Sequence, residues 1–301
     1  MPLITITDSF GTNGNEIAQI VAQNLGVGLF DDKRLQSIVK ETEVSTRTDY
    51  RFDQQAPGFW ERIRSREPQV YLDIMEGAVY DIARKGDGVI IGHGSQMLLR
   101  DFSCAFHVRL FSDFNLRVEN LVSNQGMKRD VAERIIAQYD KSQKAFFRYA
   151  FKIDIDTLSL YDLVINTGKL KARTITALIM NAIQSDDILS CSLDALSSMS
   201  RLSTERKIHA ELLENNIDIS TLNIAVSKIG EANISGMAVS QKEKNRIPEN
   251  ITKRRKPVFC SDVRNSVTLL SVTLKFQTYR PRSAQRTTAI SSKTWAPTKF
   301  L

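Results

Sequence analysis

The residues best placed to do chemistry lie in a glycine-containing loop, SFGTNGN, at residues 9–15. The apolar and β-branched stretch Leu3–Thr7 precedes this loop and predicts a buried strand, and apolar residues at helical spacing follow it and end at Gly26. Such a loop turns backbone N–H groups toward one point, where the dipole of the next helix favours an anion. Gly11 and Gly14 permit the backbone angles and close approach that this requires. The sequence therefore predicts a phosphate-binding loop.

Strands and helices alternate through the first 185 residues and must position this loop. Short apolar runs at Gly88–Gly92, Ala105–Phe111 and Leu163–Asn166 lie between turn residues, which is typical of buried parallel strands. Stretches with helical periodicity separate these runs. We therefore expect an α/β fold of three layers, with a parallel sheet that has helices on both faces.

Several segments, taken in order, resemble the cytidylate-kinase-like family of P-loop nucleoside monophosphate kinases. They are SFGTNGNEIAQIVAQNLGVGLFDD, GVIIGHGSQMLLRD, FHVRLFSDFNLRVENL, the helical lid segment DKSQKAFFRYAFKIDIDTLSLYD and YDLVINT. The resemblance covers residues 1–185 and implies a P-loop kinase-type fold. It also implies transfer of a phosphoryl group from ATP to a nucleoside monophosphate such as CMP or dCMP, with Mg²⁺ as the second cofactor.

The resemblance assigns roles to particular side chains. Binding of the ATP phosphates falls to the loop residues Gly11, Thr12, Asn13, Gly14, Asn15 and Glu16. Contact with the monophosphate falls to Asp31, Asp32, His93 and Arg100. The catalytic cations would be Arg117, Arg148 and Lys141. No set of residues with metal-ligand spacing is present, so we expect no dedicated metal site in the protein itself.

Three positions depart from the family pattern. Asn15, His93 and Gln143 stand where the family usually carries a cation. Because transfer of a phosphoryl group depends on positive charge around the phosphates, we expect weakened activity unless other cations substitute. The candidates for substitution are Arg100, Arg109, Arg117, Lys141, Lys144 and Arg148. The alternative is a catalytically degenerate nucleotide-binding sensor that signals through the C-terminal part of the chain.

Some site residues have a second interpretation. His93 contacts a substrate phosphate or is a solvated loop histidine. Asp31 and Asp32 orient the monophosphate or hold Mg²⁺, or they cap the helix that begins near Lys33. Asp154 and Asp156, in the lid segment, bind a ribose or form a turn. The residue types alone leave these alternatives open.

The C-terminal third changes character. Residues 186–202 are rich in serine and predict a linker. Residues 203–270 predict a small α+β domain that resembles a BON domain, and this resemblance implies contact with a partner protein or a membrane surface. Residues 271–301 have no periodicity and predict a disordered basic tail.

Charge and cysteine content restrict the remaining classes. The net charge is +7, and the seven basic residues after Asp262 account for all of it, so residues 1–262 are balanced and no specific nucleic acid partner is expected. The three cysteines are far apart and suit neither a disulfide framework nor a metal site, which predicts free thiols in a reducing compartment. With no apolar stretch long enough for a membrane span and no signal peptide, we expect a cytoplasmic protein.

Overall fold

The computed structural model describes residues 3–41, 68–188, 190–228, 231–238, 240, 244–248, 251, 257–262 and 269–276. The elements of the first body are, in chain order, β1 (Leu3–Asp8), α1 (Gly14–Leu25), β2 (Leu29–Phe30), α2 (Asp32–Glu41), α4 (Pro68–Ala83), β3 (Gly88–Ile91), α5 (Ser95–Leu98), β4 (Ala105–Phe111), α6 (Phe114–Gln125), α7 (Arg129–Phe151), the short 3₁₀ helix η1 (Leu158–Leu160), β5 (Leu163–Asn166) and α8 (Ala172–Ile183). The second body contains α9 (Leu193–Glu214), β6 (Leu222–Lys228), β7 (Glu231–Met237), β8 (Pro257–Asp262) and β9 (Leu269–Phe276).

The described strands of the first body form a five-stranded parallel sheet in the order β2-β3-β1-β4-β5. Strand β1 lies at its centre, where Ile4 pairs with Val89 of β3 and with Phe106 of β4. The chain crosses to one side of β1 for β2 and β3 and to the other side for β4 and β5. The loop that follows β1 therefore lies at the point where the strand order reverses, and open parallel sheets usually bind their ligands at this point.

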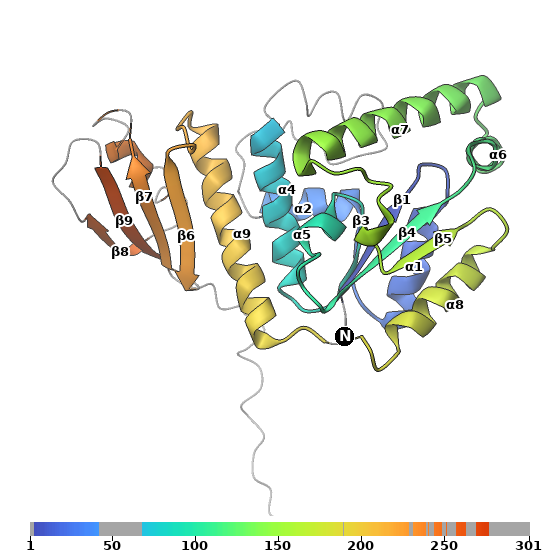
Figure 1. Ribbon diagram of the computed structural model, residues 1–301, viewed down its shortest axis with the longest axis horizontal. Helices are drawn as coiled ribbons and strands as arrows, with labels where there is room; N and C mark the ends of the chain where they lie inside the picture. The colour runs from blue at the N-terminus through green and yellow to red at the C-terminus, as the bar shows by residue number, and fades with distance from the viewer. Residues whose placement is uncertain are drawn as a thin grey trace, which may run out of the picture.

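Helices cover both faces of this sheet, as the sequence predicts (Figure 1). Ile4, Ile6 and Val108 belong to a core cluster that also contains buried residues of α1 and α8. A second cluster contains Leu3 and Ile90 together with buried residues of α2, α4, α7 and α9. The three-layer parallel α/β architecture is thus confirmed, and α7 runs across the edge of the sheet where β1, β4 and β5 end (Figure 1).

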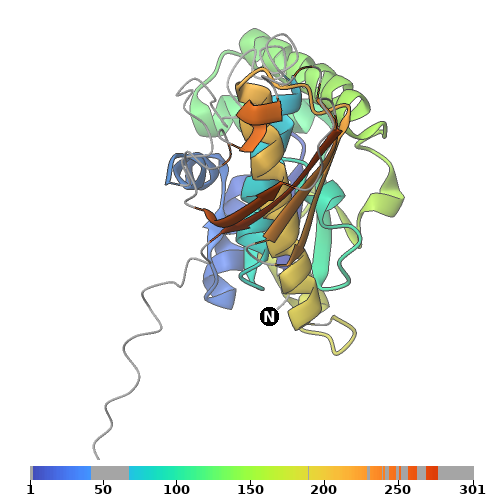
Figure 2. The ribbon, with the colours of Figure 1, turned by 90° about the vertical axis from the view of Figure 1, so that its left-hand side faces the viewer.

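The second body is a four-stranded antiparallel sheet in the order β6-β7-β9-β8, which lies against α9 (Figure 2). Helix α9 packs along α4, so it joins the two bodies (Figure 1). The linker predicted at residues 186–202 is wrong over its second half, because α9 begins at Leu193 and buries Met199. The tail predicted from residue 271 is also wrong at its start, since β9 continues to Phe276; residues 277–301 lie outside the described residues.

Two of the three cysteines form a disulfide. Cys104, just before β4, is bonded to Cys191, just before α9, with a distance of 4.9 Å between the two Cα atoms. The prediction of free thiols is therefore wrong for this pair, because a separation of 87 residues in the sequence hid their proximity in the fold. The cysteine pattern consequently gives no support to a reducing compartment. Among the described residues, no helix has the length and apolar character needed to cross a bilayer.

Candidate functional site

The glycine loop connects the end of β1 at Asp8 to the start of α1 at Gly14. Gly11 has a φ of 91° and Asn13 a φ of 60°, so the loop uses left-handed backbone conformations. The buried hydroxyl of Thr12 donates a hydrogen bond of 2.8 Å to the Ser9 carbonyl oxygen and closes the turn. The loop therefore has the strand–turn–helix geometry that phosphate binding requires, with its Thr12 side chain used internally.

Helix α6 fixes this loop from one side through Arg117. The guanidinium of Arg117 donates a hydrogen bond of 3.2 Å to the Phe10 carbonyl oxygen, and Asn120 Nδ2 donates one of 2.9 Å to the Gly11 carbonyl oxygen. A Cβ atom on Gly11 would lie only 3.0 Å from Arg117 Cβ, so this close approach needs glycine. Arg117 also forms a two-point ion pair with Asp140 of α7, with distances of 3.0 and 2.7 Å. Arg117 thus locks the loop to α7.

A pocket of about 580 Å³ opens beside the loop, over the ends of β4 and β5 and beneath α7. Its polar lining comes from Ser9, Arg109, Ser112, Arg117, Asp140, Gln143, Lys144, Asp156, Tyr161 and Asn166, and its apolar lining from Phe111, Ile155, Leu158 and Val164. A mixed lining with a few converging charged groups is typical of small-ligand sites.

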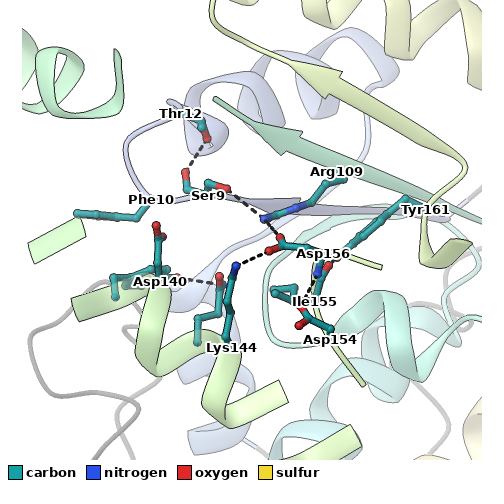
Figure 3. A network of polar contacts seen from close by, with 12 residues as sticks. Ser9, Phe10, Thr12, Arg109, Asp140, Lys144, Asp154, Ile155, Asp156 and Tyr161 are labelled. Atoms are coloured by element: carbon teal, nitrogen blue, oxygen red, sulfur yellow. Dashed lines mark hydrogen bonds and ion pairs between the residues drawn. The ribbon is translucent and has the colours of Figure 1, made fainter. Parts of the chain in front are cut away.

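The pocket contains a second group of ion pairs, centred on Asp156 (Figure 3). Arg109 of β4 is buried, and its Nη2 donates hydrogen bonds of 3.1 Å to both Ser9 Oγ and Asp156 Oδ1. Lys144 of α7 lies 2.6 Å from the other oxygen of Asp156. Tyr161 donates a hydrogen bond of 2.7 Å to the Ile155 carbonyl oxygen and anchors the neighbouring residue. One carboxylate thus holds two cations at the pocket wall.

Asp8 places a carboxyl group against the glycine loop. A Cβ atom on Gly14 would lie 2.4 Å from Asp8 Oδ2, so the carboxyl packs directly on the first residue of α1. Burial, with a smaller contribution from the negative charge of Asp32, raises the pKa of Asp8 to about 6, although the nearby charge of Arg109 acts to lower it. An acidic group at this position opposes the binding of an anion when it is ionised.

The predicted monophosphate residues Asp32 and His93 meet at the ends of β2 and β3. His93 is buried, has a φ of 59° and lies between two glycines, and its Nε2 is 2.7 Å from Asp32 Oδ1. Burial raises the pKa of Tyr71 on α4 well above its usual value, and the nearby charge of Asp32 adds to this effect. His93 is therefore a paired, buried histidine and not a solvated loop residue. Asp31 acts as a helix cap, because its Oδ1 accepts a hydrogen bond of 2.9 Å from the Arg34 N–H.

Other predicted site residues lie outside this arrangement. Arg100 is exposed, pairs with Asp101 and precedes the start of β4, whereas the site lies at the strand ends. Lys141 is exposed on α7 and does not line the pocket. Arg148 is exposed and pairs with Asp154 at 2.7 Å. The structure gives no support to the predicted roles of Arg100, Lys141 and Arg148, whereas Arg117 lines the pocket.

Asp8 was not predicted as a site residue, Ser9 was given no role within the predicted loop, and Arg109 and Lys144 were not ranked above the other cations. Helical spacing held a usable signal for Lys144. Asp140, Gln143 and Lys144 stand at i, i+3 and i+4 of α7 and share the face toward the pocket, which Lys141 does not. Nothing comparable identifies Arg109, because both faces of a central strand are buried. Asn15 and Glu16 are exposed in the first turn of α1. No cluster of three or more potential metal-ligating side chains occurs among the described residues.

Comparison with known proteins identifies a matching family and several similar proteins. A family model described as the cytidylate kinase-like family matches residues 3–169. A cytidylate kinase of Thermoplasma volcanium is 28% identical over 110 residues, which cover 36% of this chain and 58% of that protein. A cytidylate kinase of Archaeoglobus fulgidus is 24% identical over 185 residues, which cover 60% of this chain and 94% of that protein. The chain thus spans little more than half of the first relative. A crystal structure of an uncharacterized protein from Eubacterium ventriosum aligns with a TM-score of 0.49 and 19% identity, over 60% of this chain and 97% of that chain.

Proposed function

This chain belongs to the cytidylate kinase-like family, and on that premise we propose that it transfers a phosphoryl group from ATP to a nucleoside monophosphate of the CMP or dCMP type. The observation that carries the proposal is the pocket beside the glycine loop, where buried Arg109 and Arg117 and the Lys144 side chain converge. Phosphoryl transfer needs mainly positioning and neutralisation of charge, and these cations can supply both.

In this proposal the backbone N–H groups of residues 11–15 hold ATP phosphates at the N-terminus of α1. Lys144 and Arg109 contribute positive charge from the pocket wall, in place of the cation absent at Asn15. Arg117 keeps the loop and α7 in register and so acts mainly by positioning. The monophosphate binds toward Asp32 and His93, at the other side of β1.

The residues present also fit Mg²⁺, which would supply neutralisation of phosphate charge. Magnesium in phosphate sites usually takes one or two carboxylates together with phosphate oxygens and water. Asp8 is the carboxylate that packs against the glycine loop. Its raised pKa favours the ionised form only above about pH 6, where it can act as a ligand.

A turnover assay tests the proposal. The full-length chain is incubated with Mg·ATP and CMP, dCMP, UMP or AMP, and the diphosphate product is measured. We expect product with CMP or dCMP and none with the Gly14→Ala variant, because the added Cβ collides with Asp8. Circular dichroism shows whether that variant is folded. Failure of the wild-type chain to form any diphosphate contradicts the proposal.

A catalytically degenerate sensor is the second candidate, and specific observations favour it. Asn15 and Gln143 are neutral, His93 is already paired with Asp32, and Asp8 lies beside the loop. The signal would pass from α4 to α9 and its antiparallel sheet. The order of α9, β6 and β7 supports the resemblance to a BON domain, and we propose that this sheet contacts a partner protein or a membrane surface.

Restoring one cation separates the two candidates. Asn15 is exposed, whereas His93 and Gln143 are buried, so Asn15→Lys is the least disruptive restoration. The sensor predicts a large gain in turnover, of ~10-fold or more, because a cation at the phosphates lowers the barrier. The kinase with substitute cations predicts little change. Gln19→Lys, an exposed change of equal charge one turn farther along α1, controls for general electrostatic effects.

A further inference from the structure

Asp156 occupies an unusual place in the pocket, because its two oxygens bind two cations that come from different elements. Arg109 belongs to the sheet and Lys144 to α7, and both would otherwise face the pocket. Figure 3 shows the carboxylate between them. A carboxylate in such a fork has the same partners that a phosphate oxygen would take.

Two of the described cations that line the pocket have hydrogen-bond donors without an acceptor. Among the described residues, Nη1 of Arg109 and Nε of Arg117 are buried N–H groups without a hydrogen-bond partner, and Ser112 Oγ is buried without one too. Arg109 and Arg117 are each only 6% exposed. Buried donors are almost always satisfied in folded proteins. Three unsatisfied polar groups around one pocket therefore indicate a ligand with several acceptor oxygens.

The charges of the lining point to an anion. Three cations, Arg109, Arg117 and Lys144, face two carboxylates, Asp140 and Asp156. Asp140 is committed to Arg117 by two hydrogen bonds. The remaining two cations share one carboxylate, which leaves an excess of one positive charge.

Asp156 is the member of this group that can leave. Its side chain is 46% exposed, whereas that of Arg109 is 7% exposed and stays bound to Ser9 when Asp156 is absent. The neighbouring Ile155 is fixed by Tyr161, so departure requires only a local change at Asp156. The cationic pair would remain in place for an incoming ligand.

We propose that Asp156 is an internal counter-ion that holds the place of a ligand phosphate, and that a phosphoryl group with two negative charges displaces it from Arg109 and Lys144. The inference deepens the proposed function, since nucleotide phosphates are then the natural ligand. A dianion with three acceptor oxygens competes successfully with a carboxylate that has one charge. The site therefore selects phosphate over carboxylate ligands.

Inorganic pyrophosphate is the probe, since it presents phosphate oxygens without a nucleoside. Calorimetric titration of the full-length chain compares the wild type with Asp156→Asn. We expect the variant to bind pyrophosphate roughly 5- to 20-fold more tightly, because a competing negative charge is removed. The matched control is Asp130→Asn, which removes the carboxylate of the exposed Asp130–Arg134 pair in the first turn of α7. This control should bind as the wild type does.

A second variant keeps the inference falsifiable. Lys144→Gln should weaken pyrophosphate binding roughly 5-fold or more, because the exposed end of the cationic pair is lost. Unchanged or weaker binding by folded Asp156→Asn overturns the proposal, as does the absence of pyrophosphate binding in both proteins. Pyrophosphate binding without turnover would keep this inference and reject the kinase. Turnover by the wild type, together with no effect of Asp156→Asn on pyrophosphate binding, would keep the kinase and reject this inference.

Discussion

At the scale of single residues, the carboxyl group of Asp8 controls the charge beside the glycine loop. The loop has the neutral Asn15 where a cation was expected, and the carboxyl group of Asp8 packs against Gly14. Burial, with a contribution from Asp32, raises the pKa of this carboxyl to about 6, although Arg109 opposes the change. Below pH 6 the group is mostly neutral, and above pH 6 it is mostly charged and repels an anion.

We therefore expect Asp8→Asn to strengthen ATP binding in a pH-dependent way. The ratio of the two dissociation constants should be near one at pH 5 and about 5- to 20-fold in favour of the variant at pH 7.5. Taking this ratio cancels the titration of ATP itself. Calorimetry without Mg²⁺ measures it, because Asp8 could otherwise assist the metal. Glu133→Gln, a change of an exposed acid on α7, is the control. A ratio independent of pH contradicts the prediction.

Much at this scale could not be read from the sequence. Asp8 follows a buried strand and precedes a glycine loop, and this position alone does not show that its carboxyl packs on Gly14. The meeting of His93 with Asp32 depends on β2 and β3 being neighbours in the sheet, although both were candidates for the same site. Arg109 was one cation among six until the fold placed it beside Ser9.

At the scale of elements, the apolar runs predicted the buried strands well, because a parallel strand covered on both faces has no polar alternation. The first half of helix α9 was predicted as a linker for a related reason. Met199 and Ala210 face the core of the first body, whereas Ile208 and Leu212 face that of the second. A helix buried on two sides has no single apolar stripe. Its serine-rich start also resembles a linker, although Ser192 is in fact its N-cap, at 3.1 Å from the Ala195 N–H.

The contact between α4 and α9 contains two buried carboxyl groups whose pKa values are shifted in opposite directions. Burial raises the pKa of Glu76 to about 7, although Arg206 opposes this shift. Burial would also raise the pKa of Asp81, but the charge of Lys207 and hydrogen bonds from Lys207 and Ser203 outweigh it and hold the value below normal. A carboxyl group whose pKa is raised in the folded state, such as Glu76, favours folding at low pH, and this contribution is lost as the pH rises through about 7. A carboxyl group whose pKa is lowered in the folded state, such as Asp81, favours folding at neutral pH, and this contribution is lost as the pH falls into the acid range.

Substitutions at these two positions should therefore change stability in opposite directions. At pH 8, Glu76→Gln should raise the free energy of unfolding by about 1–3 kcal/mol, with little change at pH 4.5. At pH 7, Asp81→Asn should lower it by about 2–4 kcal/mol, because the buried ion pair between Asp81 and Lys207 is lost. Denaturant unfolding at several pH values measures both. The same sign for the two variants at pH 8 would show that burial does not control this contact.

At the scale of the whole molecule, α9 contributes side chains to the cores of both bodies and so connects them. Met199 and Ala210 of α9 lie in the same cluster as Ile74 and Val79 of α4. The Cys104–Cys191 disulfide fastens the segment before α9 to the start of β4. The antiparallel sheet is therefore attached to the kinase-like body through α9 and does not hang from a flexible linker. A ligand that moves α4 would also move α9.

The disulfide should stabilise this arrangement strongly. In the chain-entropy model, a bond across a separation of 87 residues contributes up to about 4.6 kcal/mol by restricting the unfolded chain. We expect reduction of the wild-type chain to lower Tm by roughly 5–15 °C. Cys191→Ser should show the same lower Tm without reductant and no further response to it. Cys260→Ser, which leaves the bond intact, should behave as the wild type does. A wild-type Tm that does not respond to complete reduction would mean that the contact between α4 and α9 holds the two bodies together without the covalent link.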